Sequence, residues 1–387
     1  MTFANSARAA VAITGVTLLT AVTLAAPAQA RTYGQERLQR DVDALKATGA
    51  SGVLAEVRLS SRTLTARAGV SDLGTGEPVD WNAYHRIGST TKTFVATVVL
   101  QLAGEGRLSL DDTVDRWLPG LVEGGAEVTV RQLLGHTSGL PDYADDVPLE
   151  RATTEEEFRR ERFRTYGPGQ LVAMAMRHRP VFPPGTGWAY SNTNYVLASM
   201  IIEKVTGTPW QQQLHERVIE PLGLRHTFTP GTSPFLPRPH LRTYRRLTPG
   251  GPAVDVTVYA AGQADGSVIS TPHDVNRFYG ALLGGRLLRP AQLAEMKETV
   301  PAAPYKEFWR EAGYGLGLMK RRLSCGDWVW FHAGGGWNAV TDNAVTTDGR
   351  RSAVVAYATT LGPDQSPLQQ IKTSAALIDR ALCADRP

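Results

Sequence analysis

The sequence predicts an α/β fold in which both ends of the chain build one domain and a mainly helical domain is inserted between them. Alternating, strand-like stretches occur near the start of the chain and again beyond residue 262, whereas residues 105–261 carry short helical patterns separated by proline and glycine. With 387 residues, 42% hydrophobic and 20% charged, the chain is long enough for two domains. The predicted domains are therefore 31–104 together with 262–387, and 105–261.

Residues 1–30 are set apart from both domains. Arg8 is their only charged residue, a long apolar stretch follows it, and Ala-Gln-Ala ends the segment at Ala30. This pattern is typical of a secretory signal peptide with cleavage after Ala30, although an uncleaved membrane anchor has a similar apolar stretch. No later segment offers about twenty uninterrupted apolar residues. We therefore expect a secreted protein that keeps no membrane span after cleavage.

The first elements of the mature chain are predicted from their periodicity. Apolar residues at helical spacing over residues 31–49 end in glycine and predict a helix. The alternating stretch over residues 53–70 turns at Ser60 and Ser61, which predicts a β-hairpin. A second helix is predicted over residues 89–103, where two glycines soon follow, and its apolar residues on nearly every side indicate burial.

The later elements are predicted in the same way. Residues 145–165 are dense in charges of both signs, which indicates a solvated helical face or loop. Strand-like stretches return at 313–323, 328–336 and 352–360, and an amphipathic helix is predicted over 367–383. Ligand sites are common in clefts between two parts of this kind, so the active site is expected there.

Charge and missing motifs exclude several classes of protein. Without Arg8 the chain has 40 basic and 37 acidic residues, and a net charge of +3 is too small to indicate nucleic-acid binding. The patterns G-x-S-x-G, C-x-x-C and G-x-x-x-x-G-K are absent from the sequence, and the segment 215–219 lacks the second histidine of a zinc helix. We expect neither a metal nor another cofactor.

Two cysteines, Cys325 and Cys383, lie near the C-terminal end of the chain. In an exported protein a single disulfide between them is expected, and it would join the strand region near residue 325 to the last helix. Two separate buried thiols are the alternative.

Three short motifs are candidates for catalytic chemistry. Ser89 and Lys92 form S-x-x-K, and residues three apart share one face of a helix. Residues 190–192 form Y-S-N, and residues 332–334 form H-x-G. Each motif is weak alone, because a serine can cap a helix, a lysine can extend to solvent and an aromatic ring can simply pack. Together, in this order and spacing, they are specific.

With these motifs the chain resembles the active-site serine hydrolases of the class C β-lactamase and D-Ala-D-Ala carboxypeptidase group of penicillin-recognising enzymes. The stretches GRLSLDDTVDRWLPG, VTVRQLLGHTSGLPDY, WAYSNTNYVLASMIIEKVTG and GSVISTPHDVNRF also look like this family. The likeness covers nearly the whole mature chain. It is greatest to small secreted D-Ala-D-Ala carboxypeptidases, which also have histidine in the third motif and a cysteine pair that matches Cys325 and Cys383. It implies an α+β fold of the β-lactamase/DD-peptidase type, with an antiparallel sheet flanked by helices.

The chemistry of the motif residues follows from their types. A serine hydroxyl needs a base, and burial beside the positive end of a helix can lower the pKa of Lys92 enough to activate Ser89. The Tyr190 hydroxyl can pass that proton to a leaving amine. Asn192 is expected to hydrogen-bond the substrate amide. We expect His332, on an apparent edge strand, to hold Tyr190 in place and to add positive potential.

The resemblance also implies an oxyanion hole. Its donors would be the backbone N–H groups of Ser89 and Gly335, and Ala333 and Gly334 would belong to the same substrate-binding strand. His136, in contrast, is expected to have a structural role in its loop.

Three anchors for a substrate carboxylate that belong to the family pattern are missing from this chain. Where the pattern has two hydroxyl residues and an arginine, this chain has Ala333, Gly335 and Met319. Strand alternation places Arg321 on the same face as Met319, so Arg321 is a candidate substitute. If Arg321 does not serve, substrates without a terminal carboxylate are favoured, and Trp337 is a candidate wall of an apolar subsite.

The sequence thus predicts a secreted active-site-serine hydrolase that acts on D-amino-acid peptides through an acyl-enzyme, of the D-Ala-D-Ala carboxypeptidase type, with β-lactams as covalent inhibitors. The alternatives are an esterase or a D-stereospecific amidase or aminopeptidase of the same fold, which the missing anchors favour, and a β-lactamase, which the histidine of the third motif disfavours. A non-catalytic binding protein is disfavoured because every motif residue is present. We expect a monomer whose substrate is a peptidoglycan-type or other D-amino-acid peptide, amide or ester.

Overall fold

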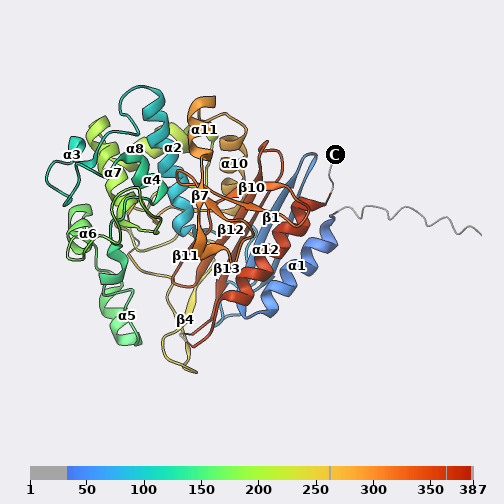
Figure 1. Cartoon of the computed structure of the whole chain (residues 1–387). Helices are drawn as coiled ribbons and strands as arrows, with labels where there is room; N and C mark the ends of the chain where they lie inside the picture. Colours follow the sequence, from blue (N-terminus) through green and yellow to red (C-terminus); the bar gives the residue numbers. More distant parts are fainter. Residues whose placement is uncertain (1–32, 261–262, 363, 385–387) are drawn as a thin grey trace, which may run out of the picture. The chain divides into compact units, whose positions relative to one another are not determined.

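The computed structural model describes residues 33–260, 263–362 and 364–384 (Figure 1). The predicted signal peptide and its cleavage site at residue 30 lie outside these residues, so export stays a prediction. Within the described ranges, no helix combines the length and the apolar character that a membrane crossing needs.

An antiparallel sheet forms the centre of this part of the chain, and both chain ends contribute to it. Its strands follow the order β2-β1-β13-β12-β10-β9-β8-β7, and β11 pairs with β12. Every pairing within it is antiparallel, as the resemblance implied. The strands are β1 (Ala50–Leu59), β2 (Arg62–Gly69), β7 (Val300–Pro301), β8 (Gly313–Tyr314), β9 (Met319–Arg322), β10 (Trp328–Phe331), β11 (Gly334–Gly336), β12 (Ala339–Thr346) and β13 (Ser352–Thr359).

Helices cover both faces of the sheet. One face is covered by α1 (Gln35–Ala47) and α12 (Leu368–Cys383), which lie side by side in Figure 1. The other is covered by α10 (Pro272–Leu283) and, behind it, α2 (Thr91–Gly104). Because side chains alternate along a strand, Val354 packs into the α2 and α10 layer and Val355 into the α1 and α12 layer. Because β13 is buried on both faces, its sequence is a continuous run of mainly apolar residues.

The middle of the chain is mainly helical and packs onto α2. Its helices share one core with α2 and α10, so the apolar helix predicted from residue 89 is buried as expected. The division into domains 31–104 with 262–387 and 105–261 stays a prediction. The remaining elements are α3 (Val114–Trp117), α4 (Val130–Gly135), α5 (Glu155–Glu161), α6 (Pro168–Ala175), α7 (Thr193–Thr206), α8 (Trp210–Leu214), α9 (Glu220–Leu222), α11 (Pro290–Lys297) and the strands β3 (His85–Arg86), β4 (Tyr244–Arg246), β5 (Ala253–Asp255) and β6 (Ile269–Ser270).

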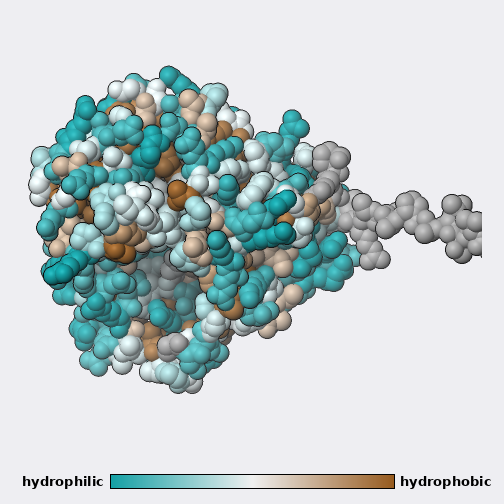
Figure 2. Space-filling view, in the orientation of Figure 1, coloured by the Kyte–Doolittle hydropathy of each residue, from teal (hydrophilic) through white to brown (hydrophobic). Residues whose placement is uncertain are grey.

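The charged segment 145–165 forms turns and one short exposed helix, in line with the predicted solvated helical face or loop. Thr154 caps α5, and its side chain and that of Glu157 satisfy each other's backbone N–H groups. Most side chains of α5 are exposed, whereas Phe158 is buried. On the face of the molecule in Figure 2 hydrophilic residues prevail and hydrophobic ones are scattered, which agrees with a core that is closed by its own layers.

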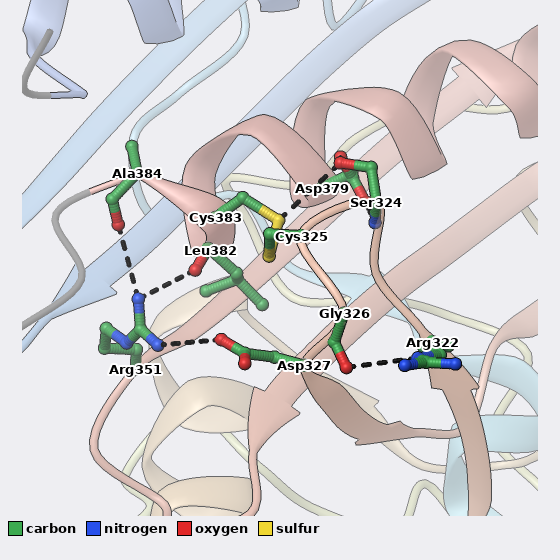
Figure 3. Close-up of a disulfide and its surroundings, with 10 residues drawn as sticks. All are labelled: Arg322, Ser324, Cys325, Gly326, Asp327, Arg351, Asp379, Leu382, Cys383 and Ala384. Carbon is green, nitrogen blue, oxygen red and sulfur yellow. Dashed lines mark hydrogen bonds and ion pairs between the residues drawn. A yellow bond between two sulfur atoms is a disulfide. The ribbon is translucent and has the colours of Figure 1, made fainter. Parts of the chain in front are cut away.

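Cys325 and Cys383 form a disulfide in the structure, between the turn after β9 and the last residue of α12 (Figure 3). Polar contacts surround it. Asp379 accepts hydrogen bonds from the backbone and side chain of Ser324, and Arg351 donates to the carbonyl of Leu382 at 2.7 Å. The disulfide and these contacts fix the C-terminal end of α12 to the sheet.

Replacing both cysteines by serine is expected to lower the free energy of unfolding by about 4 kcal/mol, because the disulfide closes a loop of 58 residues in the unfolded chain. Urea unfolding of the two proteins measures the difference. Ser324→Ala is the control, since it removes only exposed hydrogen bonds next to the disulfide and should cost less than about 1 kcal/mol. An unchanged unfolding midpoint for the double variant would contradict the expectation.

Candidate active site

A single 3₁₀ turn (η1, Gly88–Thr90) places Ser89 against β11. Gly88 has a φ of +52°, and a Cβ atom on it would lie 2.7 Å from the backbone nitrogen of Gly335. A Cβ atom on Gly334 would lie 1.8 Å from the carbonyl oxygen of the residue before Gly88. These two glycines therefore let the turn touch the strand. As a result α2 begins at Thr91, after the turn, and not at Ser89 as predicted.

Lys92 joins the first motif to the second. Its side chain is fully buried, and its ammonium group donates to Ser89 Oγ at 3.0 Å, to Asn192 Oδ1 at 2.7 Å and to the backbone oxygen of Asp265 at 2.7 Å. All three protons of a charged lysine thus have an acceptor. When the amine loses one proton, its lone pair can accept the hydrogen of the Ser89 hydroxyl instead.

The pKa of Lys92 suits this exchange. Burial lowers it from its ordinary value of 10.5 to about 8, although the charges of Asp265 and Asp142 oppose the shift. With a pKa of about 8, roughly one lysine in ten is neutral at pH 7, compared with about one in 3,000 at the ordinary value. A neutral amine beside a hydroxyl is the arrangement that a serine nucleophile needs.

Tyr190 lies next to Ser89 and Lys92, where it can act as a proton donor. The Lys92 ammonium is 4.8 Å from the centre of the Tyr190 ring. Burial raises the pKa of Tyr190 well above 10, and a hydrogen bond with Ser89 opposes the rise only in part. The hydroxyl is therefore protonated at neutral pH, so it can donate to a departing nitrogen and take a proton back from Lys92.

His136 holds the second motif in place, in agreement with its predicted structural role. Its Nδ1 accepts hydrogen bonds from the backbone nitrogen of Ser191 at 3.2 Å and from Asn194 Nδ2 at 3.0 Å. Burial lowers its pKa well below 6.5, so the ring is neutral and its Nδ1 can accept. The ring centre lies 4.3 Å from that of Tyr190, which fixes the position of this tyrosine.

His332 is a neutral member of the site, which corrects part of the sequence prediction. Burial, helped by the charge of Lys92, lowers its pKa to about 3, so it adds no positive charge. Its Nδ1 donates to the carbonyl of Ala333 at 2.8 Å, and its Nε2 accepts from the Tyr314 hydroxyl at 2.9 Å. It also follows β10, an interior strand, and not an edge strand. Its ring centre lies 6.4 Å from that of Tyr190, so Tyr314 is the hydroxyl that it holds.

Two aspartates behind Lys92 were not predicted from the sequence. Asp142 accepts from Asn192 Nδ2 at 2.9 Å, and its other oxygen accepts from a backbone nitrogen of the next turn, η2 (Tyr143–Asp146). The side chain of Asp265 accepts from the Tyr143 hydroxyl at 2.9 Å. Asp142 thus fixes Asn192, and the charges of both aspartates limit how far burial lowers the pKa of Lys92.

Two cavities meet at Ser89, and β11 separates them. The first has a volume of about 460 Å³ and the second about 350 Å³. Ser89, Gly335 and Gly336 line both. The first is also lined by Tyr190, Tyr305, Trp309, Met319, His332, Ala333, Gly334 and Asp342, and the second by Tyr143, Glu150, Tyr166, Asn192, Tyr259 and Trp337.

The structure brings most of the predicted site residues to these walls, but Lys92 lies behind Ser89 and Arg321 lies apart. As alternation predicts, Arg321 and Met319 are both buried, on the same face of β9. The Arg321 guanidinium lies 3.7 Å from the carboxylate of Asp342, and Arg321 lines neither of the two cavities. Among the described residues, no group of three or more histidines, cysteines or acidic residues is arranged to hold a metal ion.

A serine that lines both cavities, a buried lysine beside it and a protonated tyrosine define an enzyme of the serine hydrolase type. The Beta-lactamase family model matches residues 38–377, so the chain belongs to the Beta-lactamase family. This confirms the resemblance to penicillin-recognising serine hydrolases and the fold that it implies.

Solved structures and a curated relative show the same likeness. The chain is 41% identical to a D-stereospecific amidohydrolase from a Streptomyces species, with a TM-score of 0.79, over 87% of this chain and 97% of that one. It is 29% identical to the D-amino acid amidase of Ochrobactrum anthropi SV3, with a TM-score of 0.77, over 89% and 96% of the two chains. It is 32% identical to Penicillin-binding protein 4* of Bacillus subtilis over 55% of this chain and 48% of that protein, so it spans about half of the latter's length.

Replacing Tyr190 by phenylalanine is expected to lower kcat/KM about 10²- to 10⁴-fold, because the ring contacts remain and only the proton donor is lost. Any substrate that the wild type hydrolyses can be used. Tyr195→Phe is the matched control, since the Tyr195 hydroxyl donates to the carbonyl of Leu134 at 2.9 Å, away from the two cavities. It should lower stability and leave the rate nearly unchanged. If Tyr190→Phe lowered kcat/KM less than about threefold, the Tyr190 hydroxyl would not be the proton donor of the reaction.

Proposed function

We propose that this protein is a D-stereospecific amidohydrolase, which cleaves amides of D-amino acids through an acyl-enzyme on Ser89. The observation that carries the proposal is the wall of the first cavity next to His332. There the side chains are those of Met319 and Ala333, and the guanidinium of Arg321 is turned to Asp342. A substrate carboxylate in this place would lack the charge-assisted hydrogen bonds that make its burial favourable.

The cation that lines the first cavity lies at its other end. Arg245 is the cationic side chain among the described residues that line this cavity. It stacks on Trp337, with 4.7 Å between its guanidinium carbon and the ring centre. Its neighbour Tyr244 accepts a hydrogen bond from Asn338, in the turn that follows β11. Arg245 is thus held beside Trp337, beyond the Gly336 end of β11, and not beside His332.

The two cavities suit the two halves of an amide. Tyr190, the proton donor for the leaving nitrogen, lines the first cavity, and Asn192 lines the second. The leaving group therefore belongs in the first cavity and the acyl group in the second. The second cavity combines the rings of Tyr259 and Trp337 with the carboxylate of Glu150, which accepts from Trp337 Nε1 at 3.0 Å. Aromatic rings with a carboxylate suit the side chain and the α-ammonium group of an amino acid.

The reaction then has two halves. Ser89 Oγ attacks the amide carbonyl while its proton moves to Lys92, and the oxyanion is held by the backbone N–H groups of Ser89 and Gly335. Tyr190 donates its proton to the leaving nitrogen and regains one from Lys92, so the C–N bond breaks and an amine or ammonia departs. Water next attacks the acyl-serine ester, gives a proton to the Tyr190 and Lys92 pair, and Ser89 takes a proton back as the acid is released.

The solved relatives support this choice over a carboxypeptidase. The chain covers nearly all of the solved D-stereospecific amidohydrolase and of the solved D-amino acid amidase. The missing carboxylate anchors point the same way, as the sequence already indicated.

One substrate panel tests the proposal. It compares D-phenylalanine amide, L-phenylalanine amide, a D-phenylalanine ester, and a D-Ala-D-Ala peptide with a free or amidated C-terminus, each with wild type and Ser89→Ala. We expect the D-amide to exceed the L-amide by at least about 100-fold, and the amidated peptide to exceed the free acid. Preference for the free acid would favour a carboxypeptidase. Fast ester hydrolysis without a preference for the D-enantiomer would favour an esterase.

We also propose that the protein is secreted, because residues 1–30 have the composition of a signal peptide. Protein recovered from the culture medium is expected to begin at Arg31, which N-terminal sequencing checks. A chain that begins at Met1 and stays with the membrane fraction would contradict export with cleavage.

A further inference from the structure

The far end of the first cavity carries a guanidinium group with no acid beside it. Arg245, on β4, is partly exposed there and stacks on the ring of Trp337. Within the described residues its side chain has no hydrogen bond and no ion pair, and its guanidinium nitrogens remain accessible to solvent. The charge of Glu150, in the second cavity, acts on it only at longer range. An accessible guanidinium without a carboxylate partner is suited to bind an anion.

The amide of Asn338 holds this end of the cavity together. Its Nδ2 donates to the carbonyl of Tyr244 at 2.7 Å and to the carbonyl of Leu361 at 3.1 Å. It thereby joins the turn after β11 to β4 and to the segment after β13, and Figure 1 shows β4 near the end of β13. Because Arg245 follows Tyr244 directly and stacks on a ring, its guanidinium is already positioned, which lowers the entropy that binding costs.

Arg245 determines the charge that the first cavity presents. Among the described residues that line it, the other side chain with a charge is Asp342, which is nearly fully buried and has Arg321 beside it at 3.7 Å. His332 is neutral, since burial lowers its pKa to about 3. The walls between the two ends include the apolar residues Ala339, Val340, Leu361 and Ile371. The cavity is therefore a mainly apolar path with a cation at one end.

The path from Ser89 to Arg245 has the length of a short peptide. Gly335 lies against the turn that carries Ser89, and Asn338, which holds β4, is three residues farther along the chain. Three residues of extended chain span about 10 Å. Ser89 and Arg245 line the same cavity of about 460 Å³, a volume within the range of about 300 to 1,000 Å³ that is usual for ligand sites. A group of two or three residues therefore reaches from the scissile bond to the guanidinium.

The leaving group is the part of the substrate that occupies this cavity, because the proton donor Tyr190 lines it. We propose that Arg245 binds the C-terminal carboxylate of a leaving peptide of two or three residues, so that the enzyme removes single D-amino acids from the N-terminus of short peptides. This inference rests on the proposed amidohydrolase function and specifies its substrate class. A carboxylate directly after the scissile bond is too close to Ser89 to reach Arg245, so it stays unfavourable.

Peptides of increasing length test the carboxylate site with the wild-type protein. They carry D-phenylalanine followed by one to four glycines, each with a free or an amidated C-terminus. We expect the ratio of kcat/KM for acid to amide to lie below one with one glycine and to reach about ten with two or three, as one charge-assisted hydrogen bond allows. A ratio at or below one for every length would overturn the inference.

D-phenylalanine amide separates this inference from the proposed function. If the enzyme hydrolysed this amide but none of the peptides, the inference would be wrong and the proposed function would stand. If it hydrolysed neither, the proposed function itself would be wrong.

Variants of Arg245 separate recognition from a structural effect. Arg245→Gln is expected to lower the acid-to-amide ratio of the longer peptides about tenfold, and Arg245→Lys to keep part of it, because the charge remains. Arg246→Gln is the matched control, since the Arg246 guanidinium donates to the carbonyl of Gly251 and does not line the first cavity. It should keep the wild-type ratio. An equal loss for acids and amides in folded Arg245→Gln would mean a structural role only and would refute the inference.

A second pair of substrates places the carboxylate on the acyl side instead. N-succinyl- and N-acetyl-D-phenylalanine amide differ in that one group, and we expect no preference for the succinyl compound. If wild type preferred it, Arg245→Gln abolished that preference and no peptide ratio changed, Arg245 would bind the acyl group and the assignment to the leaving peptide would be wrong.

Discussion

Ser89→Ala is expected to lower kcat/KM for D-phenylalanine amide by at least about 10⁴-fold, the largest loss of any single substitution in this chain. The hydroxyl is the only group of the first motif that can form the acyl-enzyme, and the base and proton donor cannot replace it. Lys92 keeps two of its three hydrogen-bond acceptors in the variant, so the fold should remain intact.

Ser191→Ala is the matched control for this loss. Ser191 belongs to the second motif, but its hydroxyl donates to the carbonyl of Pro141 at 3.0 Å and lines neither cavity. It should change stability more than rate. If Ser89→Ala kept more than about one tenth of the activity while folded, Ser89 would not be the nucleophile.

The second large effect concerns Lys92. Since its neutral form is the base and its pKa is lowered to about 8, kcat/KM should rise about tenfold per pH unit below pH 8 and level off above it. Lys92→Met should remove this dependence and lower kcat/KM about 10³-fold or more, because an apolar side chain of similar length fills the space without accepting a proton.

Rates measured between pH 5.5 and 9.5 check both statements, and Lys372→Met, an exposed lysine of α12, is the control. A wild-type profile that falls with rising pH across this range would mean that the charged form of Lys92 is the active one, which would contradict its role as base.

Local periodicity predicted the elements whose side chains repeat regularly. The first helix, the hairpin that turns at Ser60 and the last helix all have the predicted type and nearly the predicted bounds. In each case one buried stripe or one alternating pattern dominates the sequence, and that pattern is the same one that packs against the neighbouring layer.

The strand β12 was not predicted, although it lies in the middle of the sheet. Its centre holds Thr341, Asp342 and Asn343, which are polar and almost fully buried. Each has a partner far away in the sequence: Thr341 contacts His85 at 3.0 Å, Asp342 pairs with Arg321, and Asn343 binds the backbone of residue 332. Such partners exist only in the folded chain, so a local pattern of hydrophobicity does not contain them.

The candidate site was also predicted only in part. The motifs located Ser89, Lys92 and Tyr190, because serine, lysine and tyrosine at these spacings carry recognisable chemistry. Asp142 and Tyr314 were missed, since their roles depend on distances to Asn192 and His332 that only the fold creates. For Arg321, strand alternation predicted the correct face of β9. It did not predict that the carboxylate of Asp342 lies beside the guanidinium.

The central claim is that Ser89 carries a D-aminoacyl ester during turnover. Mass spectrometry after a rapid acid quench of wild type with a D-phenylalanine ester tests it most directly. We expect a mass increase of one phenylalanyl residue, located on the peptide that contains Ser89, with no increase for the L-ester or for Ser89→Ala. An adduct on another residue, or hydrolysis at the full rate by Ser89→Ala, would contradict the claim.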